Sequence, residues 1–480
     1  MRILIPALAA LIAGPVAAQN IDYLVAPRGT AAYDTAKSRE DGQAVFAERS
    51  LTAALRNAHE TLSGCGACRV TIRIASGEYD GKAGTGQWAL PEVIAPEASL
   101  HILGGYDETF ETRNPFLTPT LMVTPPERSG IVLSFEGKKH ALAELVVSGL
   151  TFDVSPSNAY DAQTNSLMFS GSSTWGILRF GYLTTNHLVV ADNVFLNAPN
   201  GVAAPAIRAM SDQALVEVTN NVFMNNVYTW QVTSGGGKFT PRYRLAGNSF
   251  VLNWPRNPDR ATSNPGTLEI GNKYSASQID ITRNLFAFNV GGAIFPQWDD
   301  VDGPNIAITE NLFWDNGAMF DPEEPADGAV VGKFNGSATH AIFDPYDLED
   351  DFSWDTYDNV DIDPELAVPV LEVGVLKDIG RGVAPTLPDE ELTLDSIDFS
   401  LGDEDEGDDD LSLDLPSLDS GLSELTLDAD FGMEALAGDD GVLNFAPLVP
   451  YDPRALPFPH NPEAAEYGAS YTRIYQQGEG

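Results

Sequence analysis

The chain has 480 residues, of which 43% are apolar and 20% charged, and 69 acidic residues against 27 basic ones give a formal net charge of −42. A surface with so few cations cannot displace the counterions of a nucleic acid, and it does not favour an anionic lipid surface. The composition therefore excludes nucleic acid as a partner and leaves cations, basic proteins and neutral surfaces.

The N-terminus is typical of an export signal. Arg2 is followed by an apolar stretch over residues 3–13, and small residues at positions 16–18 offer a cleavage site before Gln19. The stretch is shorter than the roughly 20 residues that a membrane-spanning helix needs. We expect residues 1–18 to be a removable signal peptide, the protein to be periplasmic or secreted, and no transmembrane segment to follow.

The two cysteines form one Cys-x-x-Cys pair, Cys65 and Cys68. A redox-active pair of this kind opens a helix, whereas here Ser50 can cap a helix whose apolar residues end just before Cys65. Residues 70–74 then alternate as a strand. We therefore predict a structural disulfide, Cys65–Cys68, at a helix-to-strand turn. A redox pair is the alternative, and no second Cys-x-x-Cys supports a zinc site.

Internal repeats follow in the middle of the chain. Five segments share an apolar strand followed by Asn-x-Phe, and their Asn residues are separated by 28, 27, 36 and 27 positions. Such units bury their apolar faces only by stacking, which gives parallel strands and one continuous core. We expect the Asn side chains to form a hydrogen-bonded ladder, with Asn suited to a left-handed turn, and the Phe rings to stack inside. The Asn residues are Asn193, Asn221, Asn248, Asn284 and Asn311, and a second set after each Phe is Asn197, Asn225, Asn253, Asn289 and Asn316.

These repeats resemble the right-handed parallel β-helix proteins, an architecture shared by pectate lyases, alginate epimerases and many exported proteins of unknown activity. Residues 50–55 and 72–79 look like the capping helix and first strand of such proteins. Residues 102–115 look like an early-coil motif of uncharacterised members. The resemblance covers roughly residues 45–370 and implies an all-β, right-handed parallel β-helix (a solenoid) with an N-terminal capping helix.

Composition divides the rest of the chain. We predict a β-helix domain with its N-terminal cap over residues 19–381, an acidic low-complexity segment over 382–444 and a C-terminal tail over 445–480. Residues 382–453 contain 21 acidic residues and no Lys or Arg, so repulsion favours disorder in the acidic segment. The tail regains Pro, Tyr and Phe, which would allow it to pack back on the β-helix.

The longer repeats indicate where a ligand binds. The excess residues lie in 155–186 and 254–278, and insertions in a repeat array commonly form its binding surface. Trp rings beside Asp and Asn side chains suit saccharides, whose apolar faces stack on the rings while the hydroxyls are hydrogen-bonded. We predict a saccharide-binding groove lined by Trp254, Trp298, Trp314, Asp299 and Asp300.

Calcium is the one cofactor that the sequence suggests. The loop 298–303 offers the hard oxygen ligands of Asp299, Asp300 and Asp302 and ends in a Gly, which suits Ca²⁺. Asp358, Asp361 and Asp363 form a second acidic group. Solvated acidic turns are the alternative interpretation for both in so acidic a chain.

Catalytic signatures are incomplete. Arg208, Arg244 and Arg283 are candidates for the arginine base of a lyase, but none has the expected Arg-x-Pro context. Residues 344–347, Asp-Pro-Tyr-Asp, resemble the Asp-Pro-His-Asp motif of alginate epimerases, with Tyr346 in place of the acid–base His; a Pro-containing turn is the alternative.

Three functions follow. The first is an exported non-catalytic protein that binds saccharide or cell-envelope components along one face. The second is a polysaccharide lyase or epimerase acting on acidic glycans. The third is a scaffold whose acidic tail binds calcium or a basic protein.

Overall fold

In a computed structural model, the described part of the chain folds as a mainly β protein with few helices and long parallel sheets. The structure describes residues 456–475 and residues 19–366, the latter with gaps at 82–83, 124–130, 138, 155–157, 162–165, 170–175, 199–200, 227–228, 254–266, 272–273, 290, 297–304, 318–330, 336–337, 343–344, 346–347 and 349–353.

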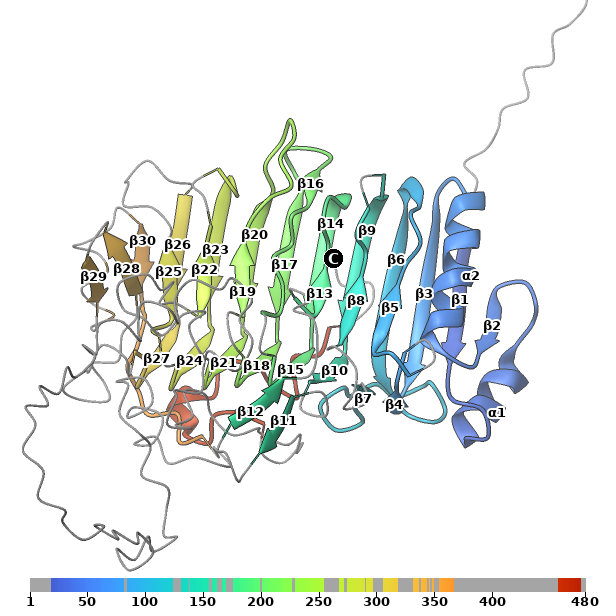
Figure 1. Cartoon of the computed structure of the whole chain (residues 1–480), viewed down its shortest axis with the longest axis horizontal. Helices are drawn as coiled ribbons and strands as arrows, with labels where there is room; N and C mark the ends of the chain where they lie inside the picture. The colour runs from blue at the N-terminus through green and yellow to red at the C-terminus, as the bar shows by residue number, and fades with distance from the viewer. Residues whose placement is uncertain are drawn as a thin grey trace, which may run out of the picture.

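The longest sheet, sheet A, runs the length of the molecule, and its strands lie side by side along the long axis (Figure 1). Apart from the first two, its strands follow one another in chain order, and all of its strand pairs are parallel. In spatial order they are β2 (Val45–Glu48), β1 (Gln19–Val25), β3 (Cys68–Ala75), β6 (Ile94–Tyr106), β9 (Ala141–Ser148), β14 (Thr184–Ala191), β17 (Leu215–Thr219), β20 (Arg242–Ala246), β23 (Gln278–Thr282), β26 (Asn305–Thr309) and β30 (Asp355–Tyr357), with β16 (Arg208–Ala209) beside β14.

Sheet B has eight parallel strands, each of which follows a strand of sheet A. The connection is one or two residues long, except before the strand at Thr120–Met122, where it spans residues 107–119. Most of its strands are three residues long, and from residue 194 onward the central residue of each is a buried Phe. The strands are β4 (Gly77–Tyr79), β7 (Thr120–Met122), β10 (Leu150–Asp153), β15 (Val194–Leu196), β18 (Val222–Met224), β21 (Ser249–Val251), β24 (Leu285–Ala287) and β27 (Leu312–Trp314).

A third layer, sheet C, has two parts. Isolated β-bridges from Ala203 to Leu178 and Trp230 connect them. The chain passes sheets A, B and C in the same order in successive repeats, which is a solenoid-like arrangement compatible with the predicted β-helix. The strands are β5 (Gln87–Ala89), β8 (Val132–Ser134) and β13 (Leu178–Arg179), then β19 (Trp230–Val232), β22 (Leu268–Ile270), β25 (Ile294–Pro296), β28 (Val331–Asn335) and β29 (Ala338–Ile342); β11 (Asn158–Asp161) and β12 (Ser166–Phe169) form a separate antiparallel pair.

One end of the stack is covered by α2 (Leu51–Gly64), as Figure 1 shows. Ser50 caps the helix by accepting a hydrogen bond from the backbone N of Ala53, and Leu55 and Leu62 join the same core as Val70 of β3. The predicted capping helix is therefore confirmed. The sequence did not suggest β1 or the short helix α1 (Ala31–Arg39), which precede it.

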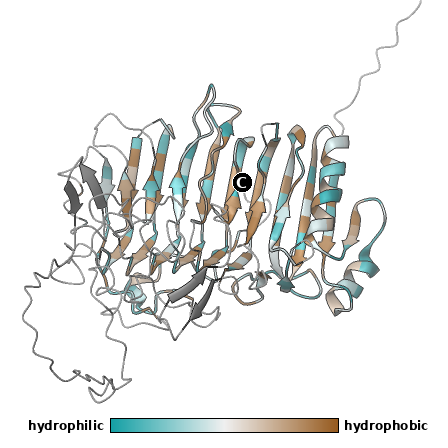
Figure 2. Cartoon of the chain, in the orientation of Figure 1, coloured by the Kyte–Doolittle hydropathy of each residue, from teal (hydrophilic) through white to brown (hydrophobic). Residues whose placement is uncertain are grey.

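Hydropathy alternates along the strands of sheet A (Figure 2), because successive side chains point to opposite faces. Inside, the Phe rings stack with centroids 4.7–5.2 Å apart. This confirms the predicted aromatic column, which consists of Phe152, Phe195, Phe223, Phe250, Phe286 and Phe313.

The Asn ladder at the corner between sheets A and B is confirmed too. Each amide donates to the side-chain oxygen of the next, for example Asn248 Nδ2 to Asn284 Oδ1 at 2.9 Å, and Asn359 adds a further rung. The left-handed residue, however, is the one before each ladder Asn, such as Arg283 before Asn284. The prediction that the Asn itself takes this conformation is wrong, because its side chain is committed to the ladder.

The second Asn set splits into two columns. Asn253, Asn289 and Asn316 continue a ladder that starts at Asn226, while Asn197 and Asn225 lie one residue earlier and are left-handed. Cys65 and Cys68 form the predicted disulfide between the end of α2 and the start of β3.

Candidate functional site

On the outer face of sheet A, the side chains at equivalent positions differ from one coil to the next. Parallel register places one outward residue of each strand beside the next, and two such rows cross the strands from β14 onward. The row nearer the ladder turn consists of small side chains, most of them threonines, and ends in a tyrosine. It contains Ala191, Thr219, Ala246, Thr282, Thr309 and Tyr357. The adjacent row is charged at its centre; it contains Val189, Glu217, Arg244, Asp280, Ala307 and Asp355.

A chain of charged hydrogen bonds crosses this face. Glu144 on β9 contacts both His101 on β6 and His187 on β14, the latter at 2.9 Å between Oε1 and Nδ1. His187 Nε2 lies 2.7 Å from Glu217 Oε2, and Arg244 Nη1 donates to Glu217 Oε1 at 3.3 Å. The chain thus joins five strands of the sheet through side chains alone.

The carboxylates determine the charge of His187. Burial alone would lower the pKa of His187, but its hydrogen bonds to Glu144 and Glu217 outweigh burial and raise it to about 9. Burial alone would raise the pKa of the Glu144 carboxyl, but its hydrogen bonds to the two histidines lower that pKa well below its usual range. The hydrogen bond from His187 likewise lowers the pKa of Glu217. At neutral pH the ring is therefore a cation with both nitrogens engaged.

A cleft of about 370 Å³ opens beside this chain, where β17, β20 and β23 end. Its lining carries three arginines and one glutamate, together with small and polar side chains. The lining residues are Thr219, Asn220, Arg244, Ala246, Gly247, Thr282, Arg283, Glu310, Arg473 and Tyr475.

The three arginines come from distant parts of the chain. Arg244 lies on β20, Arg283 in the turn after β23, and Arg473 in the C-terminal segment. Arg283 Nε donates to Glu310, and Arg473 donates to the backbone oxygens of Glu466 and Gly468. Each guanidinium has five N–H donors, so these contacts orient the groups and leave donors facing the cleft.

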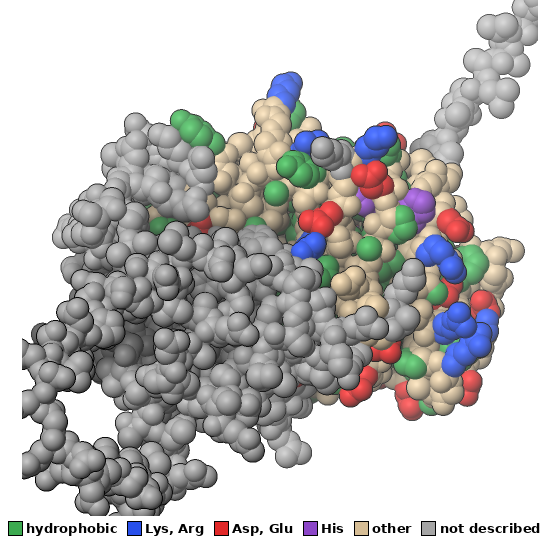
Figure 3. Space-filling view, in the orientation of Figure 1, with side chains coloured by type: hydrophobic (Ala, Val, Ile, Leu, Met, Phe, Trp, Pro, Cys, Tyr) green, Lys and Arg blue, Asp and Glu red, His purple; other side chains and the backbone are tan. Residues whose placement is uncertain are grey.

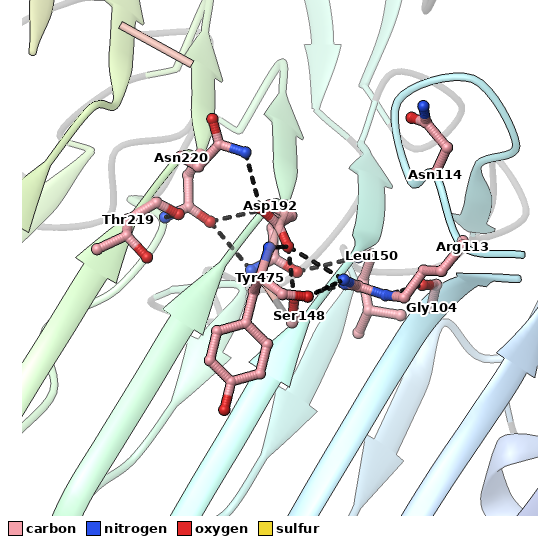
Figure 4. Close-up of polar contacts among 12 residues, drawn as sticks. Gly104, Arg113, Asn114, Ser148, Leu150, Asp192, Thr219, Asn220 and Tyr475 are labelled. Atoms are coloured by element: carbon pink, nitrogen blue, oxygen red, sulfur yellow. Dashed lines mark hydrogen bonds and ion pairs between the residues drawn. The ribbon is translucent and has the colours of Figure 1, made fainter. Parts of the chain in front are cut away.

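Residues 456–475 close one side of the cleft and pack against sheet B. Buried Asp192 accepts hydrogen bonds from Ser148 Oγ, Arg113 Nη1 and the backbone N of Tyr475, at 3.0, 3.2 and 2.9 Å (Figure 4). Asn220 extends this cluster and exchanges hydrogen bonds with the backbone of Ser470. The left-handed turn residues Asp192 and Asn220 thus fasten the segment that carries Arg473.

The predicted groove lies mostly outside the described residues: Trp254, Trp298, Asp299, Asp300 and Asp302 all do. Trp314 is partly buried on β27, in register with Ala287, so it lies on the outer side of sheet B and not among the residues that line the cleft on sheet A. The saccharide groove and the calcium loop remain predictions.

The structure also places the second acidic group and the three candidate arginines. Among the described residues no group of three His, Cys, Asp or Glu side chains is placed to hold a metal, so Asp358, Asp361 and Asp363 do not form the second acidic site. Arg244 and Arg283 line the cleft together, whereas Arg208 packs over the ring of Tyr182.

The Asp344, Tyr346 and Asp347 side chains and the acidic segment 382–444 lie outside the described residues.

Sequence reasoning missed the His–Glu chain because the outward side chains differ from one coil to the next and so form no recurring motif. Strand register was the available signal: once the Asn residues are aligned, Glu217 falls beside Arg244. On the face in Figure 3, acidic and basic side chains of the described residues are interspersed, and the large negative charge does not collect there as one patch.

No protein-family model, curated protein or solved structure matches this chain. In the part of the chain that the structure describes, no helix is both long and apolar enough to cross a membrane.

Proposed function

We propose that the chain is an exported, right-handed parallel β-helix protein of the periplasm or the extracellular space that binds saccharide or cell-envelope components along the outer face of sheet A. The observation that carries this proposal is the non-repeating outer face itself. The fold requires the same Asn and Phe residues in successive coils, but it requires no particular side chain on this face.

The small-residue row provides a surface for an extended ligand. From Thr219 to Tyr357 it crosses five strands, or about 19 Å at about 4.8 Å per strand. Threonine hydroxyls lie along the row, Tyr357 is 50% exposed at one end, and Tyr475 borders the cleft at the other. Hydroxyl groups between aromatic rings match the polar edges and apolar faces of sugars.

The same face favours binding over catalysis. A general acid or base must reach the substrate proton, and both ring nitrogens of His187 are held by carboxylates. Burial raises the pKa of Tyr475, which keeps its hydroxyl protonated and unsuited to act as a base. Lyase or epimerase activity is the second proposal, because Arg244 and Arg283 share the cleft; binding of calcium or a basic protein by residues 382–444 is the third.

The test is a binding screen of the full chain against neutral and acidic cell-envelope glycans, followed by calorimetry on the hits. Thr282→Trp should fill the cleft and weaken binding, whereas Gln87→Trp, on an exposed position of β5, should not. Ultraviolet absorbance of an unsaturated product would instead establish a lyase. Failure of every glycan to bind would remove the saccharide proposal.

A further inference from the structure

Three arginines in one cleft are unusual in a chain with only 27 basic residues and a net charge of −42. Arg244 has Glu217 as a partner and Arg283 has Glu310, but Arg473 is bonded only to backbone oxygens in the contacts that the structure describes. The lining therefore has two more cations than anions, even though Glu217 and Asp280 lie next to Arg244.

The fold holds these like charges close together. Burial and the charge of Arg283 both lower the pKa of Arg473, and Glu466 opposes them. Gly247 makes room for the arginine: a Cβ there would lie 3.2 Å from Arg473 Nη1. A pre-arranged cluster of donors that repel one another is stabilised when an anion binds between them.

We propose that the cleft binds a sulfate or phosphate ester group of a saccharide, and that the C-terminal segment completes the site by supplying Arg473. This inference rests on the proposed function and names the ligand. A planar carboxylate is satisfied by one two-pronged arginine, whereas arginines from three segments match a tetrahedral group with several oxygens. The cleft contacts the anion directly, so no bridging calcium ion is needed.

The experiment uses the full chain and four probes. They are a sulfated tetrasaccharide, the same tetrasaccharide after desulfation, a tetragalacturonate and inorganic sulfate. Arg244→Gln, Arg283→Gln and Arg473→Gln are compared with Arg179→Gln, a variant of the same net charge whose arginine pairs with Glu136 away from the cleft. Melting curves confirm that each variant is folded.

We expect each cleft variant to bind the sulfated tetrasaccharide at least about tenfold more weakly, since each loses a hydrogen bond to a charged group. Arg179→Gln should bind like the wild type, a chelator should have no effect, and added salt should weaken binding. Desulfated and carboxylated probes should bind more weakly than the sulfated one.

The outcomes separate this inference from the proposed function. Equal binding by the cleft variants and Arg179→Gln, or by the sulfated and desulfated probes, overturns the anion site and leaves saccharide binding in place. Tighter binding of tetragalacturonate overturns the tetrahedral preference. Sulfate binding that Arg283→Gln abolishes, with no glycan bound, supports the anion site and contradicts the saccharide function. Binding of no probe contradicts both.

Discussion

The corner between sheets A and B contains two neighbouring columns of residues that behave in opposite ways. The ladder column holds Asn in six successive coils, from Asn193 to Asn359. The column one residue earlier is left-handed in every one of these coils, yet it holds Asp192, Asn220, Gly247, Arg283, Glu310 and Asp358.

The difference shows what the fold demands of each position. A ladder Asn is buried and must bond to the coils on both sides, so each coil requires the same side chain. The residue before it must only tolerate a positive φ, and its side chain is available for other contacts. Five of these six variable residues hold the C-terminal segment or line the cleft: Asp192, Asn220, Gly247, Arg283 and Glu310.

The buried aromatic column should give the largest loss of stability. Phe250→Ala removes a fully buried ring stacked on both Phe223 and Phe286, and we expect a cost of about 3–5 kcal/mol in the free energy of unfolding. Tyr274→Ala, at a tyrosine that is 70% exposed, is the control and should cost far less. Urea unfolding followed by circular dichroism measures both. A similar cost for the two variants would show that the column is not the core.

The Asn ladder should come next. Asn248→Ala removes the acceptor of the Asn221 backbone N and the donor to Asn284 Oδ1, which leaves buried polar groups unpaired at a cost of about 2–3 kcal/mol. Asn305→Ala removes the same amide from an exposed position on β26 and should have little effect. An unchanged unfolding midpoint for Asn248→Ala would contradict the ladder.

The His–Glu chain should make stability depend on pH. In the folded protein the pKa of His187 is about 9, above the ordinary 6.5. The charged ring therefore contributes fully to the free energy of unfolding below pH 6.5, and this contribution disappears as the pH rises through 9. For a side chain 31% exposed, we expect roughly 1–2 kcal/mol after solvent screening. His187→Gln should flatten the profile over this range, while the exposed His460→Gln should not. A wild-type profile without this decline would contradict the charged His187.

An effect on stability of similar size is expected at Gly247. Gly247→Ala places a methyl group at a φ of +62° and against Arg473, with a cost of about 1–2 kcal/mol. Gly236→Ala has a similar φ, +71°, and no neighbour within 4 Å, so it controls for backbone strain. We expect both to lower the melting temperature, but only Gly247→Ala to weaken binding of the sulfated tetrasaccharide. Equal binding by the two variants would show that the contact with Arg473 does not matter.

The parts of the molecule that repeat were predictable, and those that do not repeat were not. Asn-x-Phe recurs because each coil needs it, so the ladder, the Phe column and the stacked parallel strands follow from spacing. Glu144 and His187 each precede Leu-Val-Val, so the repeat alone aligns them, but different side chains at one repeat position gave no motif to search for. Glu217 lies two residues further along its strand, beside Val189, so its contact with His187 follows only from the structure. Arg473 lies beside Gly247 although the two residues are 226 positions apart in the sequence, and no local pattern predicts such a contact.

Hydroxyl-radical footprinting with and without the sulfated tetrasaccharide tests most directly whether the variable outer face is the binding surface. Tyr475 lines the cleft, while Tyr274 and Tyr182 are exposed tyrosines that do not line it. We predict that the ligand protects Tyr475 and the arginine-bearing segments around it and leaves Tyr274 and Tyr182 unchanged. Protection of Tyr274 or Tyr182 with Tyr475 still fully reactive would contradict the account.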